Sequence, residues 1–237
     1  MKLAKICDNR KQTLIFLDLA KEVKGVSFVT KVNISTCKMS YATSLLIKAV
    51  SEAFEEFSHL NCMMKYGSNM KLINMKEINA RLTISQENES QEAGVYTYTI
   101  KNTDKKTVKN IYSEISLIIK TELAKQDSYR KIRLIQRLPL FIGKLLSKFM
   151  MLNSRNQVAL FGSFTVTSFG KESQNICIPI SGSTFTFTLG CPEQTENNTY
   201  KCNLVMVFDH RVLDGVEASR FLNKIKDNFM KYESNFL

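Results

Sequence analysis

The chain has no tryptophan, only three prolines and nine glycines, and two histidines in 237 residues. Because no stretch rich in Gly, Pro or Ser divides it, we expect residues 1–237 to form a single domain. A hydrophobic content of 44%, with 15 phenylalanines, is enough to bury a substantial core. These features indicate an ordinary globular protein.

Long apolar runs and clustered metal ligands are also missing. The apolar stretch from Leu14 to Leu17 is interrupted by Asp18, which excludes a secretory signal or a transmembrane span there. Six cysteines are scattered without a C-x-x-C pair, and the two histidines lie far apart, so no metal site is expected. We therefore expect a reduced, cytoplasmic protein whose cysteines act as small buried hydrophobic residues.

Acidic residues are fewer than basic ones, 22 against 33, which gives a formal net charge of +11. This charge suits a phosphate-bearing cofactor, an anionic carrier protein, a membrane surface or nucleic acid, and composition does not choose among them. No nucleic-acid-binding module is recognisable, so nucleic acid is not expected. The basic, apolar block 130–152 suits either a membrane-surface helix or a core-packing or interface helix pair with solvated basic residues, and we favour the second.

Apolar periodicity predicts the secondary structure. Alternating or β-branched runs predict six strands, at 26–35, 77–85, 95–101, 163–169, 183–190 and 202–209. Helical spacing predicts four helices, at 40–57 with Ser40 as N-cap, 107–123, 130–152 with a break at Pro139, and 216–232. Strands mixed with helices in this way favour an α/β (α+β) fold with a large mixed β-sheet covered by helices.

One histidine lies where an apolar strand gives way to a charged loop, in VMVFDHRVLDGVEASRFL (205–222). His210, Asp214 and Gly215 spell H-x-x-x-D-G, a spacing that a given histidine meets by chance about once in several hundred. An amphipathic helix is predicted to follow. The other histidine, His59, is interpreted as a helix-terminal residue, where a cation suits the helix dipole.

This motif resembles the active-site motif of the acyltransferase (E2) catalytic domains of the 2-oxoacid dehydrogenase complexes, and more distantly that of chloramphenicol acetyltransferase. GSFTVTSFG (162–170) is similar to a second E2 segment, whose hydroxyl residue stabilises the tetrahedral intermediate. Thr167 occupies that position, where the family usually has serine, and Ser168 is the second choice. Segments 38–62 and 77–85 resemble the first long helix and the next strand of the family.

The resemblance implies a chloramphenicol acetyltransferase-like fold and a homotrimer with active sites at the subunit interfaces. In such a trimer His210 of one subunit would meet Thr167 of its neighbour. Asp214 would hold the loop through an ion pair, with Arg10 as its candidate partner, and Gly215 would allow a tight turn into the helix. No lipoyl or peripheral-subunit-binding domain is expected, so the chain resembles the small stand-alone members of the family.

The implied reaction moves an acyl group from a thioester to a hydroxyl, thiol or amine acceptor. Imidazole suits proton removal from the acceptor, so His210 would be the general base. The Thr167 hydroxyl would be the oxyanion donor. Coenzyme A is a possible thioester co-substrate, and an acyl-carrier or lipoyl thioester is another. The alternative is a catalytically silent trimer that acts as a scaffold or ligand-binding module.

Overall fold

The structure of the protein is a computed structural model that describes residues 8–68, 70–87, 93–121, 134–135, 138–168, 176–196 and 199–234. Its helices are α1 (Asp8–Ala20), α2 (Met39–Glu56), α3 (Val108–Lys120), α5 (Leu140–Met151), α6 (Ser154–Phe161) and α7 (Gly215–Ser234). Its strands are β1 (Gly25–Ile34), β2 (Cys62–Met64), β3 (Leu72–Asn74), β4 (Ala80–Glu87), β5 (Ala93–Ile100), β6 (Phe164–Ser168), β7 (Phe185–Leu189), β8 (Glu193–Gln194) and β9 (Tyr200–Asp209). Two 3₁₀ turns span Ser58–Leu60 and Thr103–Lys105.

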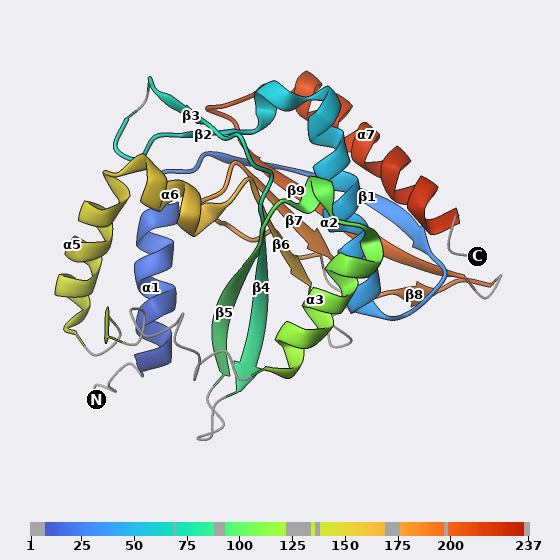
Figure 1. The fold of residues 1–237 in the computed structure, drawn as a ribbon, viewed down its shortest axis with the longest axis horizontal. Helices are drawn as coiled ribbons and strands as arrows, with labels where there is room; N and C mark the ends of the chain where they lie inside the picture. The colour runs from blue at the N-terminus through green and yellow to red at the C-terminus, as the bar shows by residue number, and fades with distance from the viewer. Residues whose placement is uncertain are drawn as a thin grey trace.

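A seven-stranded mixed sheet runs through the centre of the molecule (Figure 1). Its order is β1-β9-β7-β6-β4-β5, with β8 also paired to β9. The pairs β4–β6 and β6–β7 are parallel, and the other pairs in this sheet are antiparallel. Strands β2 and β3 form a separate hairpin. The predicted large mixed sheet with helices is therefore confirmed.

The two faces of the central sheet differ in chemistry because side chains alternate along each strand. One face carries Phe164, Phe185 and Phe187, which pack against the α2 residue Phe54 and its neighbours in the main core. The opposite face carries threonines instead, including Thr165 and Thr167 of β6. On this face the Arg81 guanidinium of β4 contacts the rings of Phe16 in α1 and Phe161 in α6.

All six predicted strands are confirmed, with shifts of up to three residues at their ends. The helix predicted at 40–57 is also confirmed as α2, but Ser40 is not its N-cap. Helix α2 begins at Met39, and Lys38 occupies the N-cap position without a side-chain capping bond. The helices predicted at 107–123 and 216–232 correspond to α3 and α7.

Helices α1 and α6 are not predicted by the sequence patterns. In α1 the apolar residues follow one another from Leu14 to Leu17 rather than forming a clear stripe, so helical spacing gives little signal. Helix α6 is only eight residues long. The β2–β3 hairpin and β8 consist of strands of two or three residues, too short for alternation to be recognised.

The basic block 130–152 forms α5 after the expected break at Pro139, while its residues 130–133 and 136–137 lie outside the described part of the chain. The favoured interpretation, a core-packing or interface helix pair with solvated basic residues, is met in part, since α5 packs on α1 and Met151 belongs to a small hydrophobic core. Whether α5 is an interface stays a prediction. Its buried residues are Gly143, Ser147 and Met151, whereas most of its large apolar side chains are exposed. The helix packs on α1 through its small residues.

Buried cysteines partly match the expectation from sequence. Cys62 and Cys202 are buried, whereas Cys37 is exposed, and none of the five cysteines in the described ranges forms a disulfide. Burial raises the pKa of the Cys202 thiol to about 12 and also raises the pKa of Cys62. The thiols of Cys62 and Cys202 are therefore inert at neutral pH.

Gly162 positions the strand that carries Thr167. Its φ of +64° is in the left-handed region, and a Cβ at this position would lie 2.8 Å from the Asn79 carbonyl oxygen. We predict that Gly162→Ala lowers the free energy of unfolding by more than about 1 kcal/mol, as measured by urea denaturation. Gly215→Ala is the matched control, because a Cβ there meets only Phe28 at 3.8 Å. Equal losses in both variants would contradict the argument.

Candidate active site

The loop that carries His210 joins the end of β9 to the start of α7, so the predicted order of strand, loop and helix is confirmed. The His210 backbone N–H donates to the Lys24 carbonyl oxygen at 2.9 Å. The Val212 N–H donates to the Asp209 carbonyl at 2.9 Å and closes the turn. His210 is thereby held at the rim of the sheet, beside Lys24 in the segment that joins α1 to β1.

The imidazole of His210 is oriented by its own loop. Its Nδ1 lies 3.2 Å from the Leu213 carbonyl oxygen. Because a carbonyl only accepts hydrogen bonds, this contact favours the neutral tautomer with its proton on Nδ1, in which the lone pair is on Nε2. The side chain is 48% exposed, so Nε2 can be approached from outside the chain.

Asp214 lies close to this ring but is not buried with it. Its Oδ1 is 3.8 Å from His210 Nδ1, and its side chain is 91% exposed. At this distance the carboxylate can stabilise an imidazolium, though water weakens the interaction. The backbone carbonyl of Asp214 also accepts from the Ala218 N–H at 2.9 Å, which helps to start α7.

An ion pair not anticipated from the sequence fixes the same loop. Asp209, only 2% exposed, accepts the Arg211 guanidinium through Nε at 3.0 Å and through the terminal nitrogen Nη2 at 2.7 Å. Asp209 Oδ1 also accepts the Arg211 N–H at 3.1 Å and the Lys24 N–H at 3.3 Å. We call this arrangement the Asp209–Arg211 clasp. The sequence contains a signal for this ion pair, because an acidic and a basic residue lie directly on either side of His210.

Thr167 lies far from His210 within one chain. It sits half-buried near the end of β6, in register with Thr188 of β7, which pairs with Val205 of β9. His210 is five residues beyond Val205, which is about 17 Å along the strand, in addition to two strand spacings across the sheet. The two side chains therefore cannot act on one group within a single chain. Ser168, the next residue, lies one residue farther from His210 in the same register.

Arg10 is not placed as predicted. It lies in the first turn of α1, whereas the last turn of that helix leads toward the His210 loop, and the described residues contain no ion pair between Arg10 and Asp214. Gly215 is the first residue of α7 and does not have a positive φ, unlike Gly67 and Gly162. Its role in a tight turn into the helix stays a prediction.

His59 follows the end of α2, as expected for a helix-terminal histidine. Its Nε2 lies 2.6 Å from the carboxylate of Glu217, in the first turn of α7. Both side chains are exposed. His59 thus links two helix ends and is not part of the candidate site.

A small cavity lies beside the clasp, between α1, α6 and the β2–β3 hairpin. Its lining includes Glu22, Tyr66, Gln157 and Arg211. Neither His210 nor Thr167 lines it. In the described part of the chain, no group of three His, Cys, Asp or Glu residues is arranged to hold a metal ion.

Solved acyltransferase structures share the fold of this chain. A chloramphenicol acetyltransferase aligns over 97% of this chain and 98% of its own, with a TM-score of 0.53 and 13% identity. The dihydrolipoamide acetyltransferase (E2p) of Azotobacter vinelandii aligns over 100% of this chain and 94% of its own, with a TM-score of 0.68 and 15% identity. The chain therefore has the chloramphenicol acetyltransferase-like fold.

The sequence comparisons point to the same family. The family model for the 2-oxoacid dehydrogenases acyltransferase catalytic domain matches residues 189–237. The lipoamide acyltransferase component of the branched-chain alpha-keto acid dehydrogenase complex of Bacillus subtilis is 28% identical over 189 residues, which are 77% of this chain and 37% of that protein. The chain thus spans less than two fifths of the length of this curated relative. The resemblance to the E2 catalytic domains is confirmed.

The clasp generates a prediction about the loop. Asp209→Asn removes a buried charge that accepts hydrogen bonds from Arg211 and from the Lys24 N–H, and it leaves Arg211 without its carboxylate. We expect the free energy of unfolding to fall by about 1–3 kcal/mol in urea denaturation. Asp214→Asn, at a position 91% exposed, is the control and should change it by less than about 0.5 kcal/mol. A similar effect of both changes would mean that the clasp does not hold the loop.

Proposed function

We propose that this protein is an acyltransferase that moves an acyl group from a thioester to a hydroxyl, thiol or amine acceptor. The observation that carries the proposal is the orientation and exposure of the His210 ring. Its Nδ1–H is directed to the Leu213 carbonyl, so Nε2 is the basic nitrogen of an accessible ring. The surrounding H-x-x-x-D-G motif and the similarity to E2 catalytic domains support this assignment.

In the proposed reaction the acceptor donates its proton to His210 Nε2 as it attacks the thioester carbonyl. The carbonyl oxygen becomes a tetrahedral oxyanion, which accepts a hydrogen bond from the Thr167 hydroxyl. When the intermediate collapses, the carbon–sulfur bond breaks and the imidazolium returns the proton to the leaving thiolate. Asp214, 3.8 Å from Nδ1, would stabilise the imidazolium in between.

The site would be shared between subunits of a homotrimer. The register of β6, β7 and β9 separates Thr167 from His210 within one chain, so a neighbouring subunit has to supply the hydroxyl. Residues 1–237 would form one catalytic-type domain. Serine is usual in the family at the Thr167 position, and threonine presents the same hydroxyl on a β-branched side chain.

A solved relative supports the roles assigned to the loop. Work on the A. vinelandii enzyme addresses a serine, a histidine and an asparagine in its catalytic mechanism, and the asparagine follows the histidine by four positions. His210 and Asp214 have the same spacing here.

We propose coenzyme A as the carrier of the thioester, with an acyl-carrier or lipoyl thioester as the other possible donor. The net charge of +11 suits the phosphates of coenzyme A. The B. subtilis relative is a lipoamide acyltransferase component, which makes the dithiol of lipoamide one acceptor to be tested.

The first test compares the parent with His210→Ala on a panel of acyl-CoA thioesters, each supplied with hydroxyl, thiol and amine acceptors. Release of free thiol is expected in the parent and should fall by about 10²- to 10⁴-fold in the variant, because a general base contributes this much. Equal rates would reject His210 as the base and favour a silent scaffold. Circular dichroism would check that the variant is folded.

The second test asks whether the site is shared between chains. Thr167→Val keeps the shape of the side chain but removes the hydroxyl, and we expect kcat to fall by about 10²- to 10³-fold, with Thr167→Ser as the active control. Reassembly of equal amounts of Thr167→Val and His210→Ala chains should restore about a quarter of the parent activity, since that share of sites joins two intact residues. A mixture that stays inactive would contradict a shared site.

A further inference from the structure

Helix α5 is built with its apolar side chains outward. Four of them are more than half exposed along one stripe, at 72% for Phe141, 70% for Leu145, 72% for Phe149 and 56% for Leu152 just after the helix end. Positions three or four apart lie on one face of a helix, so these side chains form a continuous surface. Ile142, Leu146 and Met150 extend it, at 37–40% exposure.

The face of α5 that packs on α1 includes the small buried residues Gly143 and Ser147. A Cβ on Gly143 would lie 2.9 Å from the Ile15 side chain, so the glycine permits this close approach. Lys148 pairs with Asp18 of α1 at 3.0 Å, and Lys144 lies 4.0 Å from the same carboxylate. The helix is therefore anchored through its lysines and small residues, which leaves the apolar stripe without a partner in the described part of the chain.

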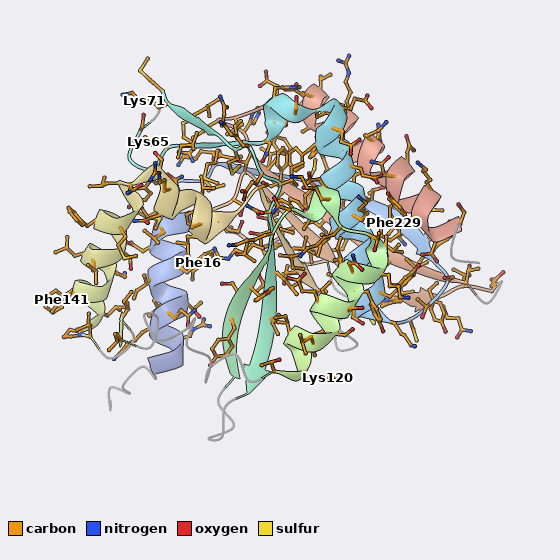
Figure 2. The ribbon with its side chains drawn as sticks, in the orientation of Figure 1. Phe16, Lys65, Lys71, Lys120, Phe141 and Phe229 are labelled. Carbon is orange, nitrogen blue, oxygen red and sulfur yellow. The ribbon has the colours of Figure 1, made fainter. Side chains whose placement is uncertain are left out.

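The segment that contains the stripe carries charge of one sign. Its described residues 138–168 include Lys144, Lys148 and Arg155 and no aspartate or glutamate. Lys65 and Lys71, on the β2–β3 hairpin, lie along the same edge of the molecule as Phe141 (Figure 2). Exposed Phe and Leu side chains bordered by cations are the composition of a helix that lies in the headgroup region of a bilayer.

We propose that α5 is a docking surface for an anionic lipid bilayer, with the stripe Phe141, Leu145, Phe149 and Leu152 entering the acyl boundary. Lys144 and Lys148, 36% and 39% exposed, lie at the border between the stripe and α1, so they can reach the headgroup level although Asp18 offsets part of their charge. None of the described helices is long and apolar enough to span a membrane, so the helix would lie on the surface. A second copy is a poorer occupant, since two such faces would bring the lysines of two α5 helices together.

The absence of tryptophan makes a direct measurement possible. Phe149→Trp places a single indole on the stripe, and Leu117→Trp, at a site on α3 that is 65% exposed, is the matched control. With vesicles of phosphatidylcholine and phosphatidylglycerol, we expect the emission of the indole on the stripe to shift to the blue and to be quenched by brominated acyl chains. Vesicles of phosphatidylcholine alone should bind much less, and added salt should weaken the binding. The indole of the control variant should not respond.

A sedimentation assay separates the apolar stripe from overall charge. Leu145→Glu should lower the partition into anionic vesicles by at least about tenfold, whereas Leu117→Glu makes the same charge change and should lower it only slightly. Both residues are exposed, so circular dichroism should show that both variants remain folded. Equal behaviour of the two variants, or no binding by the parent, would overturn the proposal. So would a change in oligomeric mass caused by Leu145→Glu without lipid, because the stripe would then be an interface between copies.

Discussion

The antiparallel pairing of β1 with β9 holds the candidate site in place. Ten residue pairs run from Ile34 and Tyr200 to Gly25 and Asp209, and His210 is the next residue after the last of them. Lys24, just before β1, then fixes the loop twice, since its carbonyl accepts from the His210 N–H and its own N–H donates to Asp209. The clasp adds a bidentate ion pair whose carboxylate, Asp209, is almost completely buried. The imidazole thus projects from a rigid rim rather than from a free loop, as pre-organised catalysis requires.

Much of the central sheet could be predicted from the sequence because its strands carry strong β-branched and aromatic alternation. Strands β6 and β7 are examples, with phenylalanine or valine on the core face and threonine on the other. Helix α2 is equally predictable because its apolar residues fall at helical spacing. Helix α1 is not, since its burial depends on contacts with α5 and α6 that local periodicity does not encode.

The candidate site shows a similar division. The H-x-x-x-D-G spacing predicts a histidine loop between a strand and a helix, and the structure has that loop. The clasp between Asp209 and Arg211 could have been suspected from their charges, but its geometry depends on the turn that closes at Val212. The expected pairing of Arg10 with Asp214 rests on resemblance alone, and the direction of α1 places Arg10 at the wrong end. A site shared between chains leaves no contact in one chain to be recognised.

The exposed stripe of α5 and the His210 loop are connected through α1. Asp18 in α1 anchors Lys148 of α5, and two residues later α1 ends at Ala20, from which four residues lead to Lys24 and its hydrogen bond with His210. If α5 rests on a bilayer, α1 fixes the height and direction of the His210 loop relative to that surface. An acceptor held in or near the membrane would then reach the imidazole in a restricted orientation, which is a form of substrate positioning that a protein free in solution would lack.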